Sequence, residues 1–272
     1  MIRTTPMKLD KPTFLGIGVM RGGTTWLHQM LKTHPDIYVP KIRKELHFFD
    51  RHYQKGNDWY RKHFDKKGYK QYGEITPAYI STKEAPERID KTLKNPKFIL
   101  ILRNPVKRAY SQYKKHLRHN ESEETFREYL ERTSSVIEKG KYYTHLQNWL
   151  KYFDRDQFKI FIFEEMMNDK KKSLKEIADF LDVPSDRFDY SKAKQKTNKS
   201  FIPRNKKLFS SIRNAYHSLS KTWFNPILKF LRILKFHRLF LHIMDSKREI
   251  PKVKPEDKNW LYKKYEKEIG RA

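Results

Sequence analysis

The stretch Phe14–Leu27, with the sequence FLGIGVMRGGTTWL, determines the fold that we expect for this chain. It opens with a short apolar run bounded by glycine, which is typical of a buried strand. A turn rich in glycine follows, and the apolar spacing from Thr24 to Leu31 predicts a helix. A strand, a glycine turn and a helix in this order form a phosphate-binding loop, because backbone N–H groups and the helix N-terminus converge on an anion.

The glycine turn has the spacing of a nucleoside-triphosphatase loop but lacks the lysine of that loop. Gly18, Gly23 and Thr25 match the pattern G-x-x-x-x-G-K-[ST], whereas Thr24 stands where the lysine belongs. The cation is instead Arg21, which lies inside the loop. The loop therefore predicts an anion site with chemistry other than that of Mg-triphosphate.

Strands and helices alternate along most of the chain outward from this stretch. Further strands are expected at residues 37–39, 98–102 and 158–163, and residues 73–77 are expected to be a strand end or a turn. Helices are expected at residues 59–64, 86–93, 105–117, 142–153, 174–181 and 252–269, and a loop at 41–50. This alternation predicts an α/β fold with a central parallel sheet flanked by helices, which binds ligands beyond the carboxyl ends of its strands.

The length fits one domain over residues 1–272, with a cofactor-binding core at about 12–205 and a helical part at about 206–272. We find neither an apolar leader at the N-terminus nor an apolar stretch of membrane-spanning length, so we expect a soluble, cytoplasmic protein. The absence of cysteine excludes disulfides and thiolate metal sites.

The charge of the chain predicts a polyanionic partner. Lys and Arg number 60 against 32 Asp and Glu, which gives a formal net charge of +28. A hydrophobic content of 37% is too high for a disordered basic tail. A basic nucleic-acid-binding module is one alternative, but such a module has no need of a glycine loop at a strand end. We therefore expect no specific nucleic-acid partner.

A second anion site is expected where the strand 98–102 ends in Arg103. A Mg-nucleotide enzyme places an aspartate at such a strand end, whereas Arg103, with Ser111 in the following helix, suits a phosphate. Arg103 could instead cap the strand or pair with a surface acid. Together with Thr24, it argues against a P-loop nucleotide kinase and favours a nucleotide with two separated anionic groups, held without a metal ion.

These segments resemble the sulfotransferases that use 3′-phosphoadenosine-5′-phosphosulfate (PAPS). Arg21–Leu27 is similar to their 5′-phosphosulfate loop, and Arg103–Pro105 with Ser111 resembles their 3′-phosphate site. Further matches follow the order of the glycosaminoglycan and bacterial branches: Lys44–Asp50 (KELHFFD), Glu74–Tyr79 (EITPAY), Gly140–Tyr142 leading into Trp149–Leu150, and Asn198–Arg204 (NKSFIPR).

The resemblance implies a P-loop-like fold, PAPS as donor and 3′-phosphoadenosine-5′-phosphate (PAP) as product, with no metal required. The acceptor that it implies is a hydroxyl, most readily that of a carbohydrate. The donor-binding residues that it implies are Arg21, Gly22, Gly23, Thr24, Thr25, Trp26, Arg103, Ser111, Tyr142, Lys199 and Arg204.

The resemblance also implies the catalytic roles. Glu45 matches the general base for the acceptor hydroxyl, and Arg21 lies where the leaving group is stabilised. His47 is the rival base, because an imidazole titrates near neutral pH. From the residues alone, Glu45 could instead be an ion-paired surface glutamate, and His47 a packed, hydrogen-bonded histidine. Most of the family carries lysine at position 21, and an arginine cannot give up a proton there.

The acceptor stays open for two reasons. Glycosaminoglycan enzymes usually place a lysine where this chain has Ile75, so a small-molecule or lipid-linked hydroxyl is an alternative acceptor. In addition, residues 223–244 interleave apolar and basic side chains. Such a segment either makes peripheral contact with an anionic membrane or packs on the domain with its basic ends in water.

Overall fold

The computed structural model describes residues 8–41, 43–119, 122, 124–194, 211 and 251–269. The chain forms two compact units. Among the described residues, the first comprises those within 8–109, 135–194 and 260–269, and the second comprises those within 110–134 and 251–259. The phosphate-binding loop and the whole described sheet belong to the first unit. The single domain expected over residues 1–272 stays a prediction.

The first unit is built on a parallel sheet with the order β2-β3-β1-β4-β5. Its strands are β1 (Phe14–Gly18), β2 (Ile37–Tyr38), β3 (Gln71–Ile75), β4 (Lys97–Leu102) and β5 (Phe158–Ile162). The run Phe14–Gly18 is buried at every residue and lies between β3 and β4. The predicted α/β fold with a central parallel sheet is therefore confirmed, and the strand before the glycine loop is the central one.

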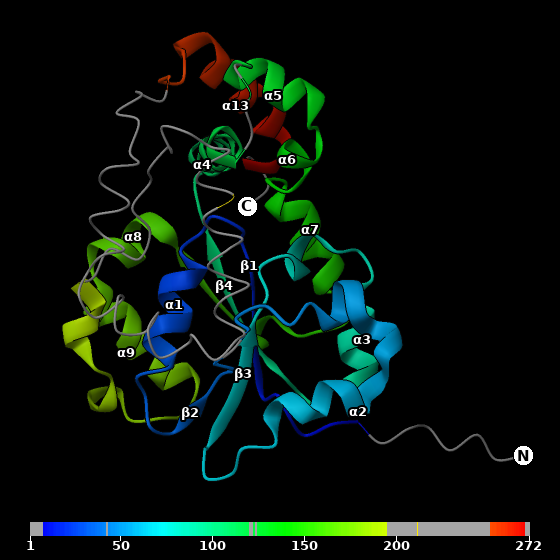
Figure 1. Ribbon diagram of the computed structural model, residues 1–272, viewed down its shortest axis with the longest axis vertical. Helices are drawn as coiled ribbons and strands as arrows, with labels where there is room; N and C mark the ends of the chain where they lie inside the picture. Colours follow the sequence, from blue (N-terminus) through cyan, green and yellow to red (C-terminus); the bar gives the residue numbers. More distant parts are fainter. Residues whose placement is uncertain are drawn as a thin grey trace, which may run out of the picture. The chain divides into compact units, whose positions relative to one another are not determined.

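Helices cover both faces of this sheet (Figure 1). On one face lie α1 (Thr24–Leu31), α8 (Phe163–Asn168) and α9 (Lys170–Phe180). On the other lie α2 (Gly56–Arg61), α3 (Ala85–Thr92) and α7 (Tyr142–Trp149). The first unit also holds α6 (Ser135–Glu138) and the later part of α13 (Pro255–Ile269).

Two hydrophobic cores fill the space between the sheet and these helices. Along β4, Ile99 and Ile101 belong to the core shared with α1 and α9, whereas Phe98 and Leu100 belong to the core shared with α3 and α7. This alternation follows from the strand geometry, in which successive side chains point to opposite faces. A strand segment buried on both faces is therefore apolar, as residues 98–101 of β4 are.

The second unit contains α5 (Phe126–Arg132), and α4 (Pro105–His119) runs from the first unit into it. A capping box formed by Thr125 and Glu128 starts α5. The ring of Tyr113 on α4 packs against Phe126, with 5.4 Å between ring centroids.

Several predicted boundaries were wrong. The expected loop 41–50 ends in a π-helical turn, Phe48–His52, because Phe48 and Phe49 are fully buried and fix the local backbone. The helix expected at 59–64 begins earlier, as α2, and ends in a 3₁₀ turn, Lys62–Phe64. The helix expected at 142–153 ends at Trp149. The helices α5, α6 and α8 were not predicted.

Within the described residues, no helix combines the length and the apolar character needed to cross a membrane. The segment 223–244, for which contact with an anionic membrane was one expectation, lies outside the described residues.

Candidate active site

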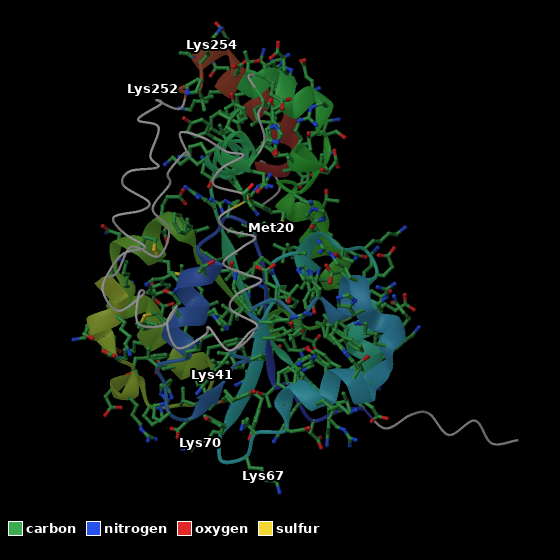
Figure 2. All side chains as sticks on the ribbon, in the orientation of Figure 1. Met20, Lys41, Lys67, Lys70, Lys252 and Lys254 are labelled. Carbon is green, nitrogen blue, oxygen red and sulfur yellow. The ribbon has the colours of Figure 1, made fainter. Side chains whose placement is uncertain are left out.

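The phosphate-binding loop lies at the carboxyl end of β1. In Figure 2, Met20 marks this loop, while Lys67 and Lys70 mark the opposite end of the sheet. Two glycines allow the close turn. A Cβ atom on Gly22 would lie 2.8 Å from the carbonyl oxygen of Ile101, and Gly23 has a φ of +86°. The loop can therefore bring its backbone close to an anion only with glycine at both positions.

The first turn of α1 supplies the backbone N–H groups of this loop, because the first N–H groups of a helix have no partner within the helix. The amide of Gly22, however, donates to the carbonyl of Val19 at 2.9 Å, and the amide of Trp26 donates to that of Gly23 at 2.9 Å. The indole of Trp26 donates to the carbonyl of Ala193 at 3.2 Å. Within the described part of the chain, the backbone amides of Gly23, Thr24 and Thr25 are therefore the ones left to donate to a bound anion.

Arg103 lies directly against this loop. Its Nη1 donates to the carbonyl oxygen of Arg21 at 2.8 Å, and its guanidinium lies over the ring of Phe163, 4.6 Å from the centroid. Burial lowers the pKa of Arg103, and the charge of Glu164 opposes this effect. Among the described residues, Arg103 Nε is buried and has no hydrogen-bond partner. A buried guanidinium with an unused N–H group fits a phosphate, so the described residues suit a nucleotide with a second anionic group.

The strand end that carries Arg103 is held from α7 and α13. The hydroxyl of Tyr142, at the start of α7, donates to the carbonyl oxygen of Arg103 at 2.9 Å. Burial raises the pKa of Tyr142, so this hydroxyl stays protonated and remains a donor. Asn104 donates to the hydroxyl of Tyr262 on α13 at 2.9 Å. Tyr142 is thus adjacent to the predicted anion site, whereas its contact with a nucleotide stays a prediction.

The remaining residues that are predicted to bind the sulfuryl donor lie farther along the chain. Ser111 is buried on α4, in the part that belongs to the second unit, and its role stays a prediction. Lys199 and Arg204 lie outside the described residues.

Four side chains of the KELHFFD segment form a continuous chain of contacts that begins at the loop. Lys44 Nζ lies 3.0 Å from Thr24 Oγ1 and 3.1 Å from Glu45 Oε1. His47 Nε2 lies 3.3 Å from Glu45 Oε2, and His47 Nδ1 lies 2.8 Å from Asp50 Oδ2. Glu45 is the most exposed of the four, at 37% of its side chain. The two predicted bases are therefore in contact, and Glu45 is the one that faces solvent.

Glu74 anchors this segment to the sheet. Its fully buried carboxylate accepts hydrogen bonds from the hydroxyls of Tyr60 and Tyr79, at 2.7 and 2.8 Å, and from the amide of Leu46 at 3.3 Å. The Tyr79 hydroxyl in turn accepts from the amide of Phe48 at 2.9 Å. Burial raises the pKa of Glu74, and these hydrogen bonds oppose the rise. Leu46 and Phe48 flank His47, so Glu74 fixes the backbone that carries the candidate base.

Sequence reasoning missed Lys44, Asp50 and Glu74 as individual residues, although it quoted the segments that contain them. The spacing between His47 and Asp50 is that of neighbours on a helical turn, which was a usable signal. Lys44 gave no such signal, because basic residues also stand at positions 41 and 43. Among the residues that the structure describes, no group of three or more His, Cys, Asp or Glu side chains is placed to hold a metal ion.

Comparison with known proteins agrees with this geometry. The sulfotransferase domain family matches residues 11–247. The chain belongs to the PAPS-dependent sulfotransferase family. Human heparan sulfate glucosamine 3-O-sulfotransferase 3A1 is 37% identical over 180 residues, which cover 62% of this chain and 44% of that protein. The membrane-associated sulfotransferase kil1 of Dictyostelium discoideum is 43% identical over 106 residues, or 38% of this chain and 22% of that protein.

The chain thus spans about half the length of the heparan sulfate relatives that it matches, since the matched segment covers 46% of the mouse 3B1 enzyme and 55% of the mouse 3-O-sulfotransferase 6. Among solved structures, a sulfotransferase from Alicyclobacillus acidocaldarius has a TM-score of 0.62 and 27% identity, covering 70% of this chain and 87% of that one.

Proposed function

We propose that this protein transfers a sulfuryl group from PAPS to a hydroxyl group of a carbohydrate acceptor that carries anionic groups. One observation carries the proposal. The segment with the candidate base, Glu45, contacts the phosphate-binding loop directly, through Lys44 and Thr24. A base for the acceptor and a cradle for the donor thus lie side by side, as a direct transfer between them requires.

PAPS, when bound, supplies a sulfuryl group attached to a phosphate leaving group. Thr24, Thr25 and the amides of the first turn of α1 would hold the 5′ end, and Arg103 the 3′-phosphate. Arg21 would add positive charge at this end of the site, and such a charge would stabilise a negatively charged leaving group.

Glu45 accepts the proton of the acceptor hydroxyl as that oxygen attacks. His47 lies between Glu45 and Asp50, with one ring nitrogen near each carboxylate. An imidazole held in this way orients Glu45 and is itself poorly placed to reach a substrate. Asp50 holds His47 in turn, and its side chain is only 8% exposed. We therefore assign the role of general base to Glu45. His47, the rival candidate for that role, is assigned a positioning role.

The acceptor class is supported by a basic cleft of about 490 Å³ next to this segment. Its charged lining residues are all basic, and they include Lys41, Arg43, Lys55 and Lys62, with the rings of Tyr38 and Trp59 beside them. Arg43 and Leu46, which lie on either side of Glu45 in the chain, both belong to the lining. Cations suit sulfate or carboxylate groups, and aromatic rings offer a flat apolar surface to a sugar. The names of the heparan sulfate relatives agree with such an acceptor.

The first experiment is calorimetric titration with PAP and with ATP. We expect clear preference for PAP, and about tenfold or greater weakening in Arg103→Ala, because one hydrogen bond to a charged group is worth about 1.5–3 kcal/mol. Equal or tighter binding of ATP would contradict the proposal.

The second experiment measures transfer of labelled sulfate to saccharides with and without anionic groups. Glu45→Gln should keep PAP affinity and lose about 100-fold or more in turnover, whereas Glu84→Gln, at an exposed acid before α3, should behave as wild type. Full activity of Glu45→Gln would refute the base assignment. Preference for an uncharged small hydroxyl compound would refute the acceptor class.

A further inference from the structure

Among the described residues, Lys44 reaches the phosphate-binding loop with its ammonium group, although it stands 20 residues after Thr24. Its side chain is only 18% exposed, and its Nζ lies within hydrogen-bond distance of both Thr24 and Glu45. In the triphosphatase pattern the loop lysine occupies the position of Thr24 itself. In this structure, an ammonium group therefore contacts Thr24, the residue that stands in place of that lysine.

The surroundings of Lys44 disfavour its charged ammonium form as long as no anion is bound nearby. Burial lowers the pKa of Lys44, and the charge of Arg21 lowers it further. The N-terminus of α1 carries a partial positive charge as well. Glu45 is the acid that opposes these effects on the pKa, and it is partly exposed. An ammonium group, an arginine and a helix N-terminus therefore converge on one place, and an anion bound there would stabilise all three.

The hydrogen-bonding capacity of Lys44 points the same way. An ammonium group has three N–H donors. Within the described residues, Thr24 and Glu45 accept two of them. Thr24 is also one of the residues whose amide remains for an anion. The third donor is thus at the correct end of the loop to reach the same group.

We propose that Lys44 is a binding residue for the 5′-phosphosulfate of the donor, filling from a separate segment the place of the missing loop lysine. This inference rests on the proposed function. It also divides the charge at the leaving group between Arg21, which cannot release a proton, and a lysine, which can.

The test compares two nucleotides by calorimetric titration: PAP, and adenosine 3′-phosphate, which lacks the 5′ group. Lys44→Met keeps the buried aliphatic stem and removes the charge. It should weaken PAP binding about tenfold or more, as expected for one charge-assisted hydrogen bond, and change the affinity for adenosine 3′-phosphate less than about twofold. Lys44→Arg should recover most of the lost PAP affinity.

The matched control is Lys32→Ala, which removes the same charge from an exposed position at the other end of α1. It should leave both affinities within about twofold of wild type, since exposed charges are strongly screened. Unchanged PAP affinity in Lys44→Met, or equal losses for both nucleotides, would overturn the assignment of Lys44. If wild-type protein instead fails to prefer PAP to ATP, the proposed function itself is wrong.

Discussion

Acidification is expected to destabilise the protein through His28. This histidine is buried on α1, and its Nε2 lies 3.2 Å from the carbonyl oxygen of Pro40. Burial lowers the pKa of His28 from 6.5 to about 4. The charges of Lys32 and Lys44 lower it further, whereas the Pro40 carbonyl and Glu45 act in the opposite direction.

The sign follows from where the proton binds more readily. The unfolded chain protonates His28 below pH 6.5, whereas the folded chain resists protonation until about pH 4. The stabilising contribution is therefore complete above pH 6.5 and declines as the pH falls towards the folded value. The difference between the two pKa values corresponds to about 3 kcal/mol of unfolding free energy, of which about 2 kcal/mol is lost by about pH 5.

Urea unfolding at pH 7 and at pH 5 measures this loss directly. His28→Gln does not titrate, and its amide can still donate to Pro40. The free energy of unfolding should therefore fall by about 2 kcal/mol more in the wild type than in the variant. Other groups that titrate in this range contribute to both proteins alike and cancel in the comparison. Equal losses in wild type and variant would refute the assignment of the pH dependence to His28.

Two further predictions concern the support of the site. Burial raises the pKa of Glu74 in the folded protein. The wild type should therefore lose stability relative to Glu74→Gln as the pH rises above about 4.3 towards the pKa of Glu74 in the folded state. Parallel pH profiles of the two proteins in urea unfolding would contradict this. Gly23→Ala should destabilise by more than the roughly 1–2 kcal/mol of an unfavourable backbone, because its Cβ would lie 2.8 Å from the ring of Phe163 on which Arg103 rests. Gly56→Ala is the control, since it has a φ of +79° and open space around it, and equal losses in both variants would refute the steric part.

The fold could be predicted where a strand is buried on both faces. β1 and residues 98–102 of β4 are continuous apolar runs because helices cover both sides of the sheet, and such runs stand out in a sequence. Prediction failed where tertiary contacts fix the backbone. Phe48 and Phe49 form a π-helical turn by packing on Tyr60 and Tyr79, and this packing has no local signature in the sequence.

The sequence segments that form the candidate site could be predicted, but the contacts between their residues could not. Arg21 and Arg103 stood out because each follows a buried strand, and the structure places the guanidinium of Arg103 on the carbonyl of Arg21. That contact spans 82 residues, so no spacing rule could provide it. Glu74 was equally hidden, because a buried carboxylate is recognised by the hydroxyls around it, which come from Tyr60, Thr76 and Tyr79.

The anion site is divided between the phosphate-binding loop and the segment that carries Lys44 and Glu45. As a result, β3 supports residues with two different roles. A triphosphatase loop carries its own lysine, so its cation depends on the loop alone. Here Lys44 and Glu45 are neighbours, and the backbone just after them is held by Glu74 at the end of β3. Loosening this anchor would displace the donor cation and the acceptor base together. Changes at Glu74 should therefore weaken PAP binding and turnover in parallel, whereas changes at Glu45 should separate the two.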